Sequence, residues 1–210
     1  MFAAVALGGD FAAVRASATV VHVEPFSSAR KSMAVALALP GGGVRVLVKG
    51  AAEIVLHACV SQLSPDGSAA PLPKAESGGA NGGAALEEMI ASYAGSALRA
   101  LLLAYRDYPA ESGAEVVQDL AGGKFKYDGL TAVALVGIKD PCRPGVPDAV
   151  AACRAAGIVV RMVTGDSIAT GKAIAEECGI YDAARGDEAI EGPVFRQMTD
   201  AQRRSVRVFP

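Results

Sequence analysis

The segment that most constrains this chain is residues 159–179, VVRMVTGDSIATGKAIAEECG, which has the pattern of an apolar strand, a tight turn and a helix. Residues 140–145, DPCRPG, precede it and follow another apolar run. The strand would deliver Thr164, Gly165 and Asp166 to a helix N-terminus, where free N–H groups and the positive end of the helix dipole favour phosphate. Gly165 would let the backbone approach a ligand closely. The pattern therefore predicts a phosphate-facing turn.

Asp166 has two interpretations at this stage. Its negative charge suits a phosphate reached through Mg²⁺ better than direct contact with the phosphate. Alternatively, Asp166 only caps the helix, as Asp often does. The local pattern leaves both interpretations open.

Composition excludes several classes of protein. The 210 residues are enough for one large domain or two small ones, and 51% of them are apolar, so a sizeable core can be buried. The net charge of −2 lacks the basic excess of a nucleic-acid surface. No apolar run reaches the ~18 residues of a membrane span, so we expect a soluble chain. Four cysteines without CxxC spacing predict buried, reduced thiols of an intracellular protein.

Apolar periodicity and turn residues predict the elements. Continuous or alternating apolar runs indicate strands, and Pro40–Gly43 is typical of a hairpin turn. The Gly, Pro and Ser residues of 64–83 predict a flexible surface loop. Residues 107–128 are predicted to be another, polar loop. We expect strands at 19–23, 33–39, 44–48, 101–105, 130–138 and 159–163, and helices at 51–59, 86–97, 146–156 and 168–178.

The order of elements changes near residue 140. Hairpins and helices mix before it, as in an α+β unit, whereas strands and helices alternate after it, which predicts parallel strands. We therefore expect one domain over 1–139 and a second over 140–210. Asp140, Pro141 and Pro144 would form a semi-rigid joint, because proline restricts its own φ and the preceding residue. An ordinary strand–helix loop within one domain is the alternative.

Seven segments, in the same order along the chain, resemble the cytoplasmic region of P-type ATPases, especially the calmodulin-regulated calcium pumps with the plant autoinhibited members. They are LGGDF (7–11), VEPFSSARKSM (23–33), VKGAAEIVL (48–56), ALRALLLAYRD (97–107), GIKDPCRPGV (137–146), VRMVTGDSIATGKAIAEECGI (160–180) and AIEGPVFRQM (189–198). The resemblance implies an α/β fold, in which a partial α+β nucleotide-binding domain precedes part of a Rossmann-like phosphorylation domain of the haloacid-dehalogenase type.

By position, the resemblance implies a nucleotide site. Phe26 matches the ring that stacks on adenine, and Lys31 lies in the same basic segment. Lys49 and Gly50 would line the pocket, and Arg99 would reach the phosphates of ATP. The residue types suit these roles, because a planar ring offers adenine a stacking face and Lys and Arg offer charge to phosphate.

Other matched positions concern the second domain. Asp140 and Arg143 match the hinge motif, while Thr164, Gly165 and Asp166 match the second motif of the phosphorylation site and so imply a catalytic role. No residue is assigned as a direct metal ligand.

Each nucleotide-site residue also has an ordinary interpretation on its own. Phe26 could be a core residue, and Lys49 could be a solvated lysine. Arg99 could pair with Asp107 or a nearby Glu. The sequence alone does not decide among these.

The resemblance implies ATP and Mg²⁺ as cofactors. For an intact pump it implies Ca²⁺, transmembrane helices and calmodulin as partners, at the cytosolic face of a membrane. Neither DKTGT, which carries the phosphorylated aspartate, nor TGDGxND occurs in this sequence. We therefore expect a fragment of a calcium-transporting ATPase that binds ATP, has an incomplete Mg²⁺ cage and does not turn ATP over. A stand-alone nucleotide-binding or regulatory module is the alternative. A soluble phosphatase is disfavoured, because no DxD motif occurs.

Overall fold

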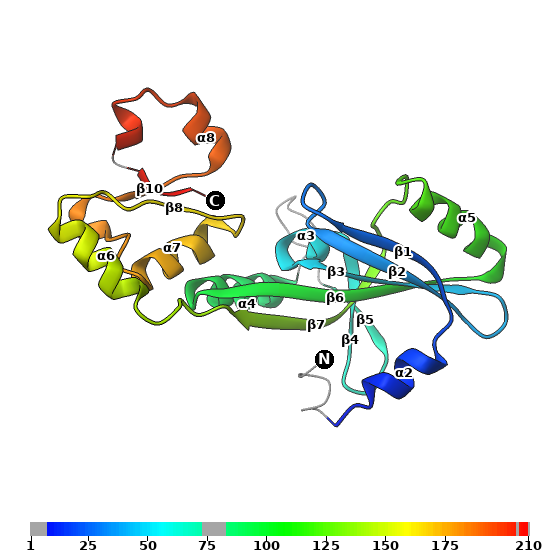
Figure 1. Cartoon of the computed structure of the whole chain (residues 1–210). Coiled ribbons are helices and arrows are strands. Elements are labelled where there is room, and N and C mark those ends of the chain that lie inside the picture. The colour runs from blue at the N-terminus through cyan, green and yellow to red at the C-terminus, as the bar shows by residue number, and fades with distance from the viewer. Residues whose placement is uncertain (1–7, 73–82, 205, 210) are drawn as a thin grey trace. The chain divides into compact units, whose positions relative to one another are not determined.

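A computed structural model gives the structure of the chain (Figure 1) and describes residues 8–72, 83–204 and 206–209. The chain divides into two compact units. The first consists of Met1–Ala84 and Leu101–Val136, and the second of Ala85–Ala100 and Gly137–Pro210. The mixed α/β fold class is confirmed. The functional boundary at residue 140 stays a prediction.

A seven-stranded sheet forms most of the first unit, in the order β1-β2-β3-β6-β7-β4-β5. β1, β2, β3 and β6 pair antiparallel in succession, β4 lies parallel to β7, and β5 is antiparallel to β4. The bounds are β1 (Val20–Ser27), β2 (Ser32–Ala38), β3 (Val44–Ala51), β4 (Cys59–Leu63), β5 (Ala69–Pro71), β6 (Leu98–Tyr108) and β7 (Leu130–Lys139).

β2 and β3 form the predicted hairpin, with Ala38 opposite Val44. Gly41 and Gly42 have φ angles of +89° and +92°, a conformation that glycine adopts without steric cost. Every second residue of the two strands points into the core, as expected for a sheet with one buried face. The buried apolar residues of this hairpin are Ala34, Ala36, Val44, Val46 and Val48.

Three helices accompany this sheet: α2 (Phe11–Ser17), α3 (Ala52–His57) and α5 (Ala110–Ala121). The prediction of a loop over 107–128 is wrong, because β6 continues to Tyr108 and α5 follows it. Gly113, Val116 and Leu120 are buried and recur at helical spacing, so their stripe faces the core. The polar residues between them give this segment its loop-like composition.

The predicted loop 64–83 holds for residues 64–68, which form a turn, and is wrong for residues 69–71. Ala69–Pro71 forms β5, with Leu63 opposite Ala69. Residues 73–82 of this loop lie outside the described residues. β4 was not expected, because it follows α3 with only Ala58 between them.

The second unit carries the expected parallel strands. Its sheet has the order β8-β10-β9, with both pairings parallel. The expected strand 159–163 is reduced to β8, because only Met162 and Val163 pair with β10. Its elements are α4 (Ala84–Gly95), α6 (Val146–Ala155), β8 (Met162–Val163), α7 (Ile168–Glu177), β9 (Glu188–Ala189), α8 (Gly192–Gln197) and β10 (Val206–Phe209). Its buried cluster consists of Val150, Ala175, Cys178, Ile180 and Tyr181.

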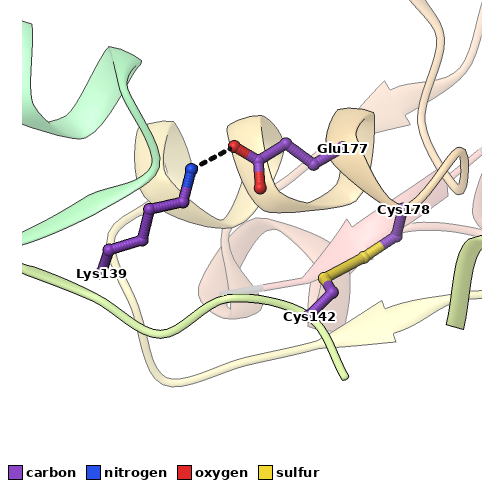
Figure 2. The surroundings of a disulfide bond; sticks show 4 residues. All are labelled: Lys139, Cys142, Glu177 and Cys178. Atoms are coloured by element: carbon purple, nitrogen blue, oxygen red, sulfur yellow. Dashed lines mark hydrogen bonds and ion pairs between the residues drawn. A yellow bond between two sulfur atoms is a disulfide. The ribbon is translucent and has the colours of Figure 1, made fainter. Parts of the chain in front are cut away.

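The cysteines correct the sequence interpretation. Cys142 and Cys178 form a disulfide across a sequence separation of 36 residues (Figure 2), whereas Cys59 and Cys153 are free. The expectation of four reduced thiols is therefore wrong for this pair. Its two members lie in segments that only the tertiary fold brings together, so spacing along the chain gives no sign of the pairing.

None of the helices within the described ranges has both the length and the apolar character needed to cross a bilayer.

Candidate functional site

The TGD turn lies where the sequence places it, between β8 and α7. Ser167 caps the helix, since its hydroxyl accepts the Thr170 N–H at 3.3 Å. Asp166 is therefore not the cap, and the capping interpretation is wrong. Its backbone N–H donates to Thr164 Oγ1, and Thr164 Oγ1 donates to the Asp166 carboxylate, both at 3.1 Å. These two hydrogen bonds within the turn hold the Asp166 carboxylate in place.

Arg99 is the main partner of Asp166. Its Nε lies 2.7 Å from one carboxylate oxygen, and its Nη2 lies 3.0 Å from the other. The Arg99 side chain is 51% exposed and that of Asp166 is 13% exposed. Two predicted site residues, 67 positions apart in sequence, are therefore held together in the second unit.

The alternative that Arg99 pairs with Asp107 is wrong. Asp107 lies opposite Arg45 in the β3–β6 ladder and takes both of its hydrogen bonds, at 2.6 and 2.7 Å. Arg45 and Asp107 are a cross-strand pair, and hydrogen bonding to Asp107 raises the pKa of the Arg45 guanidinium. The two arginines thus have separate carboxylate partners in separate units.

Gly165 meets no obstruction in the structure. A Cβ built on it would have no heavy atom within 4 Å. The space beside its Cα is therefore open, and the approach of a ligand to this backbone stays a prediction. Gly165 is not required for packing.

Phe26 lies near the end of β1 and is 61% exposed. The interpretation of Phe26 as a core residue is therefore wrong. A ring this exposed presents a face on which a planar ligand can stack. The function of that face stays a prediction.

Lys49 lies on an open face of the sheet. Along β3 it follows Leu47 by two residues, so both side chains share one face. Leu47 is opposite Val35, which is opposite Val23. Val23 is 46% exposed and Leu47 is 40% exposed, and Lys49 is also exposed. Lys49 therefore stands beside an uncovered apolar surface in the first unit.

Lys31 and Gly50 meet through the backbone. Lys31 closes the turn after β1 with a φ of +50°, and its carbonyl accepts the Ala51 N–H at 2.9 Å. A Cβ on Gly50 would lie 2.6 Å from that carbonyl and 2.7 Å from Ser32 Cβ. Gly50 therefore permits the close approach of the turn to β3. This packing role was not anticipated for Gly50.

Four predicted site residues thus gather at one end of the β1–β2–β3 meander. Ser32 is opposite Gly50 and Met33 is opposite Lys49, while Phe26 and Lys31 flank the turn between β1 and β2. These four residues belong to the first unit, whereas Arg99 and the TGD turn belong to the second.

Asp140 and Arg143 lie in the connection between β7 and α6, where both are exposed. The Arg143 carbonyl accepts the Val146 N–H at 3.2 Å, and Gly145 has a φ of +85° at the start of α6. The connection is therefore a defined turn. Its role as a hinge stays a prediction.

A buried polar cluster in the first unit was missed by the sequence reasoning. Glu24 is 7% exposed, pairs with Arg30 at 3.2 Å and accepts a hydrogen bond from the Tyr127 hydroxyl. Burial and this hydrogen bond raise the pKa of Tyr127. A cavity of about 250 Å³ lies beside it, lined in part by Arg30, Tyr127 and Leu130. Tyr127 is far from Glu24 in sequence, so no local motif could reveal the cluster.

Mg²⁺ prefers near-octahedral coordination by oxygen ligands. The TGD turn supplies the Asp166 carboxylate, whose oxygens already bind Arg99 and Thr164. Over the described parts of the chain, no group of three His, Cys, Asp or Glu side chains is arranged to hold a metal ion. These residues therefore do not fit a Mg²⁺ site by themselves.

Comparison with known proteins now identifies the family. Residues 2–145 match the family model described as P-type ATPase, cytoplasmic domain N. The chain is 44% identical over 200 residues to calcium-transporting ATPase 4, plasma membrane-type, of Arabidopsis thaliana, covering 95% of this chain and 18% of that protein. It is 48% identical over 194 residues to calcium-transporting ATPase 10, plasma membrane-type, of Oryza sativa subsp. japonica, covering 92% of this chain and 18% of that protein. The chain thus spans less than a fifth of the relatives it matches, and it belongs to the P-type ATPase family.

Proposed function

We propose that this chain is the ATP-binding part of a P-type calcium-transporting ATPase. The observation that carries the proposal is the match to domain N over residues 2–145, together with the exposed ring of Phe26 in that same region. Lys31 and Lys49 lie at the same end of the β1–β2–β3 meander as Phe26. An exposed ring and two nearby ammonium groups suit a planar base that carries phosphates.

In the proposed complex, Phe26 stacks on adenine and Lys31 and Lys49 attract the phosphates. Gly50 acts indirectly, because it lets the turn that carries Lys31 lie against β3. Arg99 pairs with the Asp166 carboxylate when no nucleotide is bound, and it exchanges this carboxylate for a phosphate of ATP. A bidentate guanidinium is well suited to exchange one oxyanion for another.

Within a whole pump, we propose that ATP bound by these residues phosphorylates an aspartate and that the phosphoryl transfer drives Ca²⁺ across a membrane. Phosphoryl transfer depends on positioning and on neutralising charge. The TGD turn would contribute through the open backbone at Gly165. Mg²⁺ and calmodulin are further proposed partners of the whole protein, which would act at the cytosolic side of its membrane.

The 210-residue chain by itself is proposed to bind ATP without transferring the γ-phosphate of ATP. The reason is chemical: the sequence contains no DKTGT, so the usual acceptor aspartate of the family is not in it. Asp166 does not replace that aspartate, because Ser-Ile-Ala-Thr follows it and not the Lys-Thr-Gly-Thr of the phosphorylation motif.

A stand-alone nucleotide-binding or regulatory module is the second candidate, since the matched family model describes domain N alone. Sequencing the full transcript distinguishes the two. DKTGT upstream and TGDGxND downstream in one reading frame would establish a pump. A transcript whose start and stop codons enclose neither motif would favour the stand-alone module.

Calorimetric titration of the purified chain with ATP and adenosine tests the proposal. We expect ATP to bind more tightly than adenosine, and Phe26→Ala to weaken both by about 1–3 kcal/mol, the range for a base stacked on an aromatic ring. An affinity for ATP that Phe26→Ala leaves unchanged would refute the site. A parallel incubation with γ-labelled ATP should give no acid-stable phosphoenzyme. Its appearance would refute the proposed lack of transfer.

A further inference from the structure

The disulfide joins two segments that frame the TGD turn in sequence. Cys142 lies in the connection between β7 and α6, and Cys178 lies at the C-terminal end of α7. Figure 2 shows a second link beside it, the ion pair of Lys139 Nζ with Glu177 at 2.9 Å. Both residues of that ion pair are close to half exposed. The connection and the end of α7 are therefore joined twice, once covalently and once by an exposed charge pair.

The two cysteines differ in how exposed they are to solvent. Cys178 is 2% exposed and belongs to the buried cluster of the second unit. Cys142 is partly buried and packs against the same cluster. A free cysteine behaves as a small apolar side chain, so both thiols suit this environment when reduced. The fold therefore accommodates the pair in either oxidation state, and Cys142 is the more exposed member of the pair.

We propose that Cys142 and Cys178 are a reversible oxidation site that takes a hydroperoxide as oxidant and locks the β7–α6 connection to α7. Neither the family match nor the nucleotide chemistry above assigns a role to this pair.

The chemistry proceeds in two balanced steps. The Cys142 sulfur attacks one oxygen of hydrogen peroxide, the O–O bond breaks, and the products are a sulfenic acid and water. The Cys178 sulfur then attacks the Cys142 sulfur, the S–O bond breaks, and the second water leaves with the thiol proton. Together, two thiols and one peroxide give one disulfide and two waters. A dithiol reverses the reaction by thiol–disulfide exchange and is itself oxidised.

Oxidation closes a loop across 36 positions that contains α6, β8, the TGD turn and α7. A disulfide stabilises mainly by restricting the unfolded chain, and more so for longer loops. The oxidised second unit should therefore unfold at a temperature on the order of 10–20 °C higher than the reduced one. The exposed ion pair Lys139–Glu177 cannot supply such a constraint by itself.

The chain provides two internal controls. Cys153, on α6, is a free cysteine that is partly buried like Cys142, so it reports on exposure without a neighbouring sulfur. Cys59 is fully buried, its thiol donates to the Val55 carbonyl, and burial raises its pKa to about 12. If solvent exposure alone decided which cysteine is oxidised, peroxide would oxidise Cys153 as readily as Cys142. If the proximity of the two cysteines in the fold decides it, peroxide forms the disulfide between Cys142 and Cys178.

Peptide mapping of the full chain tests the proposal. The chain is reduced with dithiothreitol, exchanged into buffer, treated with hydrogen peroxide, alkylated and digested with a protease that cleaves before Asp. Cleavage before Asp140, Asp148, Asp166 and Asp182 places Cys142 in 140–147, Cys153 in 148–165 and Cys178 in 166–181. We expect peptides 140–147 and 166–181 to be recovered as one linked species, which dithiothreitol separates.

Variants complete the test. Cys153→Ser should keep both the link and the rise in unfolding temperature, and Cys142→Ser should lose both while circular dichroism shows a folded chain. The proposal is overturned if the folded wild-type chain gives alkylated thiols in both peptides after peroxide. Oxidation of Cys142 to sulfinic acid without a link would overturn it as well, and so would a link that includes peptide 148–165 or an unchanged unfolding temperature.

Discussion

The ion pair between Arg99 and Asp166 makes a specific prediction about ATP affinity. If Arg99 binds phosphate, ATP must compete with the Asp166 carboxylate for the same guanidinium. Replacing Asp166 by Asn removes the competing charge and keeps a side chain of similar shape. We therefore predict that Asp166→Asn binds ATP more tightly than the wild-type chain does.

The magnitude follows from the geometry of the pair. Arg99 makes two contacts with the carboxylate, at 2.7 and 3.0 Å, but its side chain is 51% exposed. Exposed ion pairs contribute roughly 0.2–1 kcal/mol after solvent screening. Two contacts and the 13% exposure of Asp166 place this pair near the upper end of that range. A release of about 1 kcal/mol corresponds to roughly fivefold tighter binding of ATP.

Calorimetric titration of ATP and adenosine into Asp166→Asn measures this effect, and Asp107→Asn is the matched control. Asp107 makes a similar two-contact pair with Arg45, and its removal changes the net charge by the same amount. Only Asp166→Asn should tighten ATP binding, and neither variant should change adenosine binding. Unchanged or weaker ATP binding by a folded Asp166→Asn chain would refute the proposed competition between ATP and Asp166. Equally tighter binding by both variants would show that the change in net charge alone is the cause.

Three further variants test single residues. Lys49→Ala should weaken ATP by about 1 kcal/mol and adenosine hardly at all, with the difference shrinking at high salt; Lys124→Ala is the exposed-lysine control for the same titration. Gly50→Ala should lower the free energy of unfolding by about 1–3 kcal/mol in urea denaturation, because its Cβ would lie 2.6 Å from the Lys31 carbonyl, whereas Gly165→Ala should be neutral. Burial raises the pKa of the Cys59 thiol from 9.0 to about 12. As the pH rises, the thiol therefore ionises in the unfolded chain before it does in the folded one. The free energy of unfolding should fall above pH 9 by up to about 1.4 kcal/mol per pH unit. Urea denaturation at pH 8 and pH 10 should show a smaller fall for Cys59→Ala, and equal falls would contradict the shift.

Local chemistry was enough to predict much of this structure. The Pro40–Gly43 turn and the alternating residues around it predict the β2–β3 hairpin, because turn type and side-chain period are properties of short segments. The apolar run before Thr164 and the Ser167 that follows the TGD turn likewise define where α7 begins. The position of Asp166 beside a helix start was predictable for the same reason.

Other features depend on residues far apart in sequence. The Arg99–Asp166 pair, the Cys142–Cys178 disulfide and the Glu24–Tyr127 hydrogen bond each require the tertiary fold, which local periodicity does not encode. Helix α5 was missed because its buried stripe is narrow among polar residues. The strand at 159–163 was overestimated because strand length depends on pairing with a neighbour, and β10 pairs with only two of its residues.

Photolabelling with 8-azido-ATP tests whether Phe26 binds adenine, because the reactive azide of this ATP analogue is on the base. After irradiation and protease digestion, mass spectrometry locates the label, and an excess of ATP serves as competitor. We expect a label within residues 23–33 or 47–51 that ATP prevents and that is strongly reduced in Phe26→Ala. A label elsewhere in the chain that ATP prevents, or a label at these residues that ATP does not prevent, would contradict the proposal that Phe26 binds adenine.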